Sequence, residues 1–90
     1  MVRYHLIFKG RVQGVGFRFT AQNLANKYGI LGWVRNNPDG TVELVAEAEK
    51  EKLDLFLEEL REDFKGYIYE SHKKVLPATG EFNSFRIAFF

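Results

Sequence analysis

The sequence ILGWVRNNPDGTVELVAEA, residues 30–48, contains the signals that decide the fold. At its centre is Asn37-Pro38-Asp39-Gly40, where proline fixes φ and glycine can adopt a positive φ, as a tight turn requires. Apolar and polar residues then alternate up to Ala48, which is the period of a strand with one buried face. The stretch therefore predicts a β-hairpin with strands at about 30–36 and 41–48.

The residues before the hairpin predict a strand, a loop and a helix. Apolar side chains fall on even positions from Val2 to Phe8, which predicts a strand that ends at Gly10. A loop with glycines at positions 14 and 16 follows, and Gly29 is the expected C-terminal cap of the helix after it. The apolar stripe of that helix consists of Phe17, Ala21, Leu24, Ala25 and Tyr28.

The residues after the hairpin predict a second helix and two more strands. The helix is expected at about 50–63, and a strand at about 67–76. After a break at 77–80, the alternation of Phe85, Ile87 and Phe89 predicts a short closing edge strand. The apolar stripe of the second helix consists of Leu53, Phe56, Leu57, Leu60 and Phe64.

The order of these elements is βαββαβ plus a short terminal strand. Both helices are amphipathic and the sheet needs a cover, so we expect the helices on the same face. The sequence thus predicts an α+β, ferredoxin-like βαββαβ sandwich: a mainly antiparallel sheet covered on one face by two helices, with a short extra C-terminal strand. Residues 1–90 are expected to form a single domain.

Composition excludes several classes of partner. There are 13 Lys and Arg against 12 Asp and Glu, a net charge of +1, so we expect no broad basic surface for nucleic acid. No apolar run approaches the roughly 20 residues that span a bilayer. The absence of cysteine favours a reducing compartment and removes thiolate nucleophiles. We expect a cytoplasmic monomer that contacts neither nucleic acid nor a membrane.

The glycine-bearing loop before the first helix is a candidate anion site. Backbone N–H groups at a helix N-terminus lack intrahelical partners and carry partial positive charge, so they can bind an anion. Arg18 follows in the first helical turn and offers two coplanar donors. The loop lacks the Lys and hydroxyl residue of the G-x-x-x-x-G-K-[ST] pattern. On these features alone, a structural turn with a solvated Arg18 remains the favoured interpretation.

Two longer motifs resemble the signatures of the acylphosphatase family. GRVQGVGFR, residues 10–18, is similar to the first signature, G-x-V-Q-G-V-x-F-R. GWVRN, residues 32–36, together with Gly40 and Val42, is similar to the second, G-[aromatic]-V-[K/R]-N-x-x-x-G-x-V. Phe8 and Ala48 depart from the family pattern at strand ends, where they affect packing.

The resemblance implies a hydrolase that cleaves the carboxyl–phosphate bond of a small-molecule acyl phosphate, with no metal and no cofactor. It implies that Arg18 binds the phosphate and that Asn36 orients the attacking water. The residues alone would not have singled out Asn36. The residues whose backbone would then bind the phosphate oxygens are Gln13, Gly14, Val15, Gly16 and Phe17.

Three other functions are weighed against this one. RNA recognition is disfavoured because the strand at 41–48 has no aromatic residue on which a base could stack. A domain of a larger maturation enzyme that handles carbamoyl phosphate is disfavoured because the chain starts at Met1 and has no zinc-finger cysteines. A phosphate- or carbamoyl-phosphate-binding module with little turnover stays open, because binding and catalysis would use the same groups.

Overall fold

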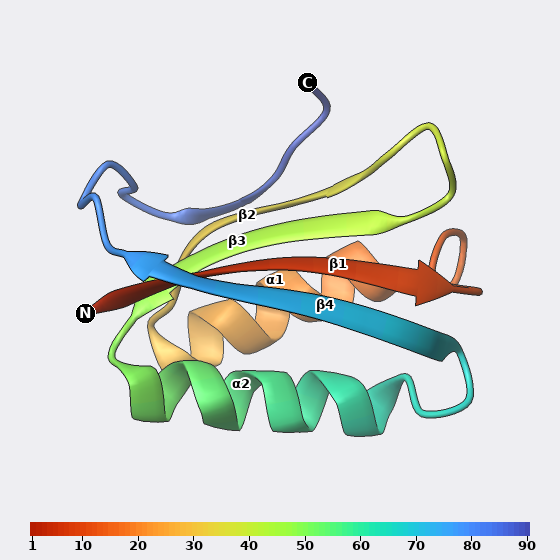
Figure 1. Cartoon of the computed structure of the whole chain (residues 1–90), viewed down its shortest axis with the longest axis horizontal. Helices are drawn as coiled ribbons and strands as arrows, with labels where there is room; N and C mark the ends of the chain where they lie inside the picture. The colour runs from red at the N-terminus through yellow and green to blue at the C-terminus, as the bar shows by residue number, and fades with distance from the viewer.

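A computed structural model describes all residues, Met1–Phe90, as two helices packed on one five-stranded sheet (Figure 1). The sheet order is β4-β1-β3-β2-β5; β2 and β5 are parallel, and every other neighbouring pair is antiparallel. The predicted ferredoxin-like sandwich with a short extra strand is therefore confirmed. The elements in chain order are β1 (Val2–Gly10), α1 (Phe17–Tyr28), β2 (Leu31–Asn36), β3 (Val42–Ala48), α2 (Lys50–Asp63), β4 (Ile68–Pro77) and β5 (Phe85–Ile87).

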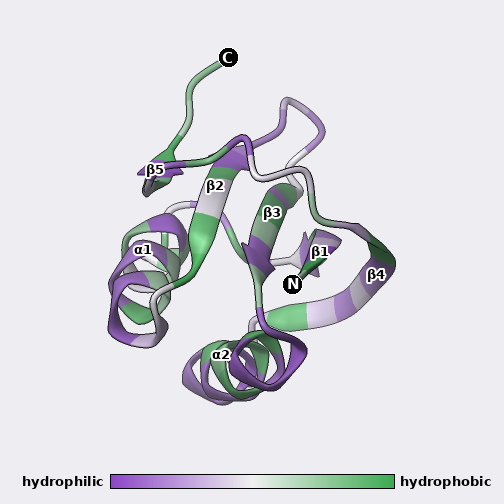
Figure 2. Cartoon of the chain, turned by 90° about the vertical axis from the view of Figure 1, so that its left-hand side faces the viewer, coloured by the Kyte–Doolittle hydropathy of each residue, from purple (hydrophilic) through white to green (hydrophobic).

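The hydrophobic core lies between the sheet and the helices, which Figure 2 shows on the same side of the sheet. Tyr4, Leu6 and Phe8 of β1 point into it and are at most 1% exposed. Leu6 pairs with Leu44 in the register of β1 and β3, so neighbouring strands present their apolar residues on the same face. Neither helix is long and apolar enough to cross a membrane.

The ends of α1 are set by glycines on both sides. Gly16 is the N-cap residue, with φ of 82°, and Gly29 is the C-cap residue, as predicted. Beyond Gly29, the N–H of Ile30 donates to the carbonyl of Ala25 at 2.8 Å, which satisfies one of the last carbonyls of the helix. The loop at residues 11–16 is thereby held where β1 ends and α1 begins.

Two predicted strand boundaries need correction. β4 begins at Ile68 because the N–H of Tyr67 bonds back to the carbonyl of Phe64, which closes a turn after α2. β5 ends at Ile87, so the assignment of Phe89 to this strand was wrong. The N–H of Ala88 makes the last bond to the sheet, and the chain then leaves the sheet edge.

Candidate functional site

The loop between β1 and α1 presents a row of unpaired backbone N–H groups. Gly14 and Gly16 have φ of 77° and 82°, in the left-handed region that glycine adopts without a steric penalty. No side chain caps the helix, and its first turn has no acidic residue. No amide from Val12 to Phe19 donates a hydrogen bond within the chain. Such a set of amides, at the positive end of a helix dipole, is suited to an anion.

A pocket of about 210 Å³ opens at this helix N-terminus. It is formed by the β1–α1 loop, the first turn of α1, the end of β2 and the C-terminal segment. The pocket therefore brings together Arg18 and Asn36, which a helix and a strand separate along the chain. Its lining residues are Val12, Gly14, Gly16, Phe17, Arg18, Phe19, Asn36, Ile87 and Phe89.

The side chain of Arg18 is free to bind an anion in the pocket. Its guanidinium carbon lies 5.6 Å from the centre of the Phe89 ring, a contact that favours a position over the pocket. None of the ion pairs of the chain includes Arg18. No carboxylate therefore competes with a phosphate for its donors.

Asn36 places an unpaired carboxamide oxygen at the same pocket. The residue ends β2 and pairs with Val42 of β3, so its backbone is fixed by the sheet. Its Oδ1 atom is buried and has no hydrogen-bond partner. Leaving a buried acceptor unpaired costs about 1–3 kcal/mol. Asn36 thus brings a hydrogen-bond acceptor without a partner in the chain to the lining of the pocket.

Gln13 and Val15 do not line the pocket, although both were predicted to bind substrate through their backbone. The side-chain Nε2 of Gln13 donates to the carbonyls of Asn37 and Thr41, at 2.8 and 2.9 Å. Gln13 thus joins the loop to the hairpin turn that follows Asn36. Val15 packs against the hydrophobic core. Among the predicted backbone set, the residues that do line the pocket are Gly14, Gly16 and Phe17.

Sequence reasoning missed the apolar part of the pocket. Phe19 is 59% exposed and Phe89 is 84% exposed, and both line the cavity together with Val12 and Ile87. One signal was available for Phe19, because it lies off the apolar stripe of α1 and so has no place in the core. Phe89 was not recognised as a pocket residue, because its alternation with Phe85 and Ile87 predicted that it ends a strand.

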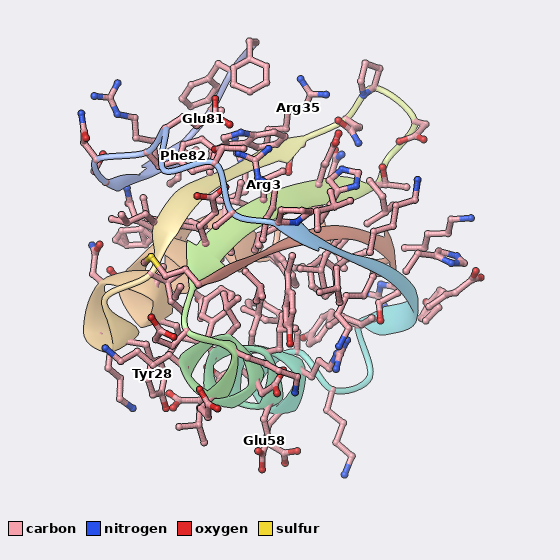
Figure 3. The ribbon with its side chains drawn as sticks, turned by 60° about the vertical axis from the view of Figure 1, so that its left-hand side comes forward. Arg3, Tyr28, Arg35, Glu58, Glu81 and Phe82 are labelled. Carbon is pink, nitrogen blue, oxygen red and sulfur yellow. The ribbon has the colours of Figure 1, made fainter.

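The other polar clusters lie elsewhere. His5 contacts Glu43 at 2.7 Å, on the face of the sheet opposite to the helices. The same face carries Arg3, Glu81 and Phe82, which Figure 3 shows together, far from Glu58 of α2. A larger hollow of about 670 Å³ over α2 has lining charges of both signs and a single apolar residue. It is a charged surface with one apolar lining residue, Leu57, and it lies apart from the β1–α1 loop.

Comparison with known proteins points to one family. The family model described as Acylphosphatase matches residues 4–87. An acylphosphatase of Marinobacter nauticus is 44% identical over 85 residues, which cover 93% of this chain and 92% of that protein. The crystal structure of acylphosphatase from Bacillus subtilis has a TM-score of 0.91 at 34% identity, covering 99% of this chain and 100% of that one. Full-length HypF in its phosphate- and nucleotide-bound form has a TM-score of 0.86 at 30% identity, covering 99% of this chain and 12% of that one.

Proposed function

The chain belongs to the acylphosphatase family and is an acylphosphatase, and we propose that Arg18 and Asn36 carry out its chemistry. The observation behind the proposal is that both side chains line one pocket together with unpaired loop amides. The reaction is the hydrolysis of an acyl phosphate to a carboxylate and phosphate.

Arg18 and the loop amides bind and stabilise the phosphoryl group. In phosphoryl transfer the developing charge spreads over the equatorial oxygens, so most of the catalysis is positioning and electrostatic stabilisation. The guanidinium can donate to two phosphate oxygens at once, and the amides of Gly14, Gly16 and Phe17, which line the pocket, can donate to others. Loss of one preorganised donor costs about 10²–10³ in kcat.

Asn36 orients the attacking water. Its unpaired Oδ1 can accept a hydrogen bond from water, and its Nδ2 can donate to the phosphate. A carboxamide is no general base, so the proton of the water goes to a phosphate oxygen of the substrate. The leaving carboxylate needs no acid. The groups of the pocket are mostly hydrogen-bond donors rather than metal ligands, and the proposed reaction needs no metal or cofactor.

Two variants test these roles. Arg18→Ala and Asn36→Ala should each lower kcat/KM for benzoyl phosphate by about 10² or more, measured in excess chelator. Arg61→Ala and Asn23→Ala, at exposed positions of α2 and α1, are the matched controls and should keep wild-type activity. Circular dichroism and thermal unfolding establish that each variant is folded. A folded Arg18→Ala or Asn36→Ala enzyme with wild-type kcat/KM would overturn the assignment.

We also propose that the protein acts as a cytoplasmic monomer with residues 1–90 as a single domain. The absence of cysteine supports a reducing compartment, and the one hydrophobic core supports a single domain. Light scattering of the purified chain tests the oligomeric state.

A further inference from the structure

The pocket at the N-terminus of α1 has a polar side and an apolar side. The polar side consists of the loop amides, Arg18 and Asn36, which account for a phosphate and a water molecule. The apolar side consists of Val12, Phe19, Ile87 and Phe89, and neither the phosphate nor the water has a use for it. An acyl phosphate has one further part, its acyl group.

Phe19 and Phe89 are large apolar side chains that remain mostly exposed to solvent. They leave 59% and 84% of their surface open to solvent, although a buried phenylalanine is among the most stabilising residues of a core. They reach the pocket from distant parts of the chain, one from the first turn of α1 and one from the C-terminal segment. Exposed apolar residues that converge on one cavity are typical of a ligand-binding surface.

The charged residues around the pocket also limit which acyl groups can bind, because few of them are free to pair with an anion. Arg18 is the sole charged residue of the lining, and the phosphoryl group occupies its donors. The neighbouring arginines are engaged elsewhere: Arg11 lies over the ring of Tyr67, and Arg35 pairs with Glu43. An acyl group with a second carboxylate would therefore find no free cation at the apolar side.

We propose that Phe19 and Phe89 bind the acyl group, so that the enzyme selects acyl phosphates with aromatic or bulky apolar acyl groups over small or anionic ones. This inference rests on the proposed function of the same pocket. The phosphoryl group lies against the amides and Arg18, and the acyl group extends between the two rings toward solvent. Aromatic rings contact one another favourably in tilted or offset arrangements. The rings of Phe19 and Phe89 can adopt such arrangements around the aromatic ring of an acyl group.

The test compares kcat/KM for benzoyl, acetyl and succinyl phosphate. The wild-type enzyme should prefer benzoyl phosphate, and succinyl phosphate should be the poorest substrate. Phe19→Ala and Phe89→Ala should each lower the benzoyl-to-acetyl ratio of kcat/KM by about threefold to tenfold, the value of one aromatic pair. The matched control is Phe90→Ala, because Phe90 packs on Trp33, away from the pocket, and should leave the ratio unchanged.

The outcomes separate this inference from the proposed function. Arg18→Ala should lower kcat/KM for all three substrates and weaken competitive inhibition by inorganic phosphate, whatever the acyl group. If Phe19→Ala and Phe89→Ala lower the benzoyl and acetyl values equally, the rings do not select the acyl group and the inference fails. It also fails if the wild-type enzyme shows no preference among the three substrates, even when Arg18→Ala is inactive.

Discussion

The side chain of Gln13 joins the hairpin turn to the loop whose backbone amides are proposed to bind the phosphate. Its Nε2 donates to two carbonyls of the hairpin turn, those of Asn37 and Thr41. The turn follows directly on Asn36, so the same side chain fixes the distance between the loop amides and the carboxamide. A misplacement of 1 Å in such a site can cost about 10²-fold in rate.

Gln13→Leu should therefore impair catalysis more than stability. We expect kcat to fall by about tenfold or more, while the removal of two hydrogen bonds lowers the free energy of unfolding by about 1–3 kcal/mol. Gln22→Leu is the matched control, since Gln22 also donates to a carbonyl, that of Phe85, but does not line the pocket. Steady-state kinetics and urea denaturation of both variants measure the two effects. Equal losses of kcat in both would contradict the positioning role.

Glu47 is a carboxylate that the protein buries and keeps charged. It is 2% exposed, and it accepts hydrogen bonds from Arg3, from the backbone N–H of Thr79 and from that of Gly80. Burial raises the pKa of Glu47, but the hydrogen bonds from Thr79, Arg3 and Gly80 outweigh burial and lower the pKa to about 2. The segment between β4 and β5 is thereby anchored to the sheet.

This anchor makes stability depend on pH in an acidic window. Because the pKa of Glu47 is lower in the folded state, its contribution is complete above the unfolded pKa of 4.5 and is lost as pH falls toward about 2. The loss over that window is about 3 kcal/mol. Glu47→Gln should be less stable than wild type at pH 7, and the difference should shrink as pH falls. The exposed Glu49→Gln makes the same charge change and is the control; a difference that stays constant with pH would contradict the prediction.

At the scale of the elements, Gly32 permits the close approach of β2 and β3. A Cβ atom at this position would lie 1.9 Å from the carbonyl oxygen of Val45, and the φ of Gly32 is 144°. The obstruction is backbone, which cannot move away without breaking the pairing of the strands. Glycine is therefore required at position 32, the second residue of β2.

Gly32→Ala should consequently be among the most damaging substitutions in the chain. We expect a loss of about 4 kcal/mol or more in the free energy of unfolding, a large share of the stability of a small domain. Gly40→Ala is the control because Gly40 also has a positive φ, 90°, but its Cβ would meet no atom. That variant should lose about 1–2 kcal/mol. Thermal unfolding compares the two, and similar melting temperatures would show that space between the strands is not limiting.

The elements were predictable where their signals are local. The Asn37-Pro38-Asp39-Gly40 turn and the alternation after it identify the hairpin, and the glycines at 16 and 29 identify the ends of α1. The pairing of β1 with β4 and the parallel pairing of β5 with β2 depend on contacts across the whole chain, which local patterns do not specify. For the same reason β5 was predicted too long at Phe89.

The residues of the candidate site also differ in whether a local sequence signal predicts them. Arg18 and the loop glycines have a local signal, because a glycine-bearing loop before a helix is a candidate anion site, although a structural turn stays the favoured interpretation until the family motifs are considered. Asn36 has no local signal. The role proposed for it depends on its position beside a loop that lies before α1 in the sequence, and only the family resemblance singled it out. Phe19 and Phe89 could not be assigned to the pocket, since their meeting depends on where the C-terminal segment leaves the sheet.

At the scale of the whole molecule, the pocket joins three parts of the chain. The β1–α1 loop, the end of β2 and the segment after β5 all contribute to its lining, so a bound ligand holds together elements that separate on unfolding. The net charge is +1, which gives little long-range attraction for anions. Phosphate binding should therefore depend on the local arrangement of amides and guanidinium rather than on the charge of the protein.

Inorganic phosphate should then stabilise the whole fold through this one site. At a concentration of 100 times Kd, binding to the native state adds about 2.7 kcal/mol, which raises Tm by about 10 °C or more in a domain of this size. Arg18→Ala should lose most of this shift because the pocket lacks its cation. Lys65→Ala should keep it, since Lys65 lies on the charged surface over α2, outside the pocket. Calorimetric scans over a phosphate series measure the shift, and an equal rise of Tm in Arg18→Ala would mean that phosphate acts as a general salt and not as a ligand of this pocket.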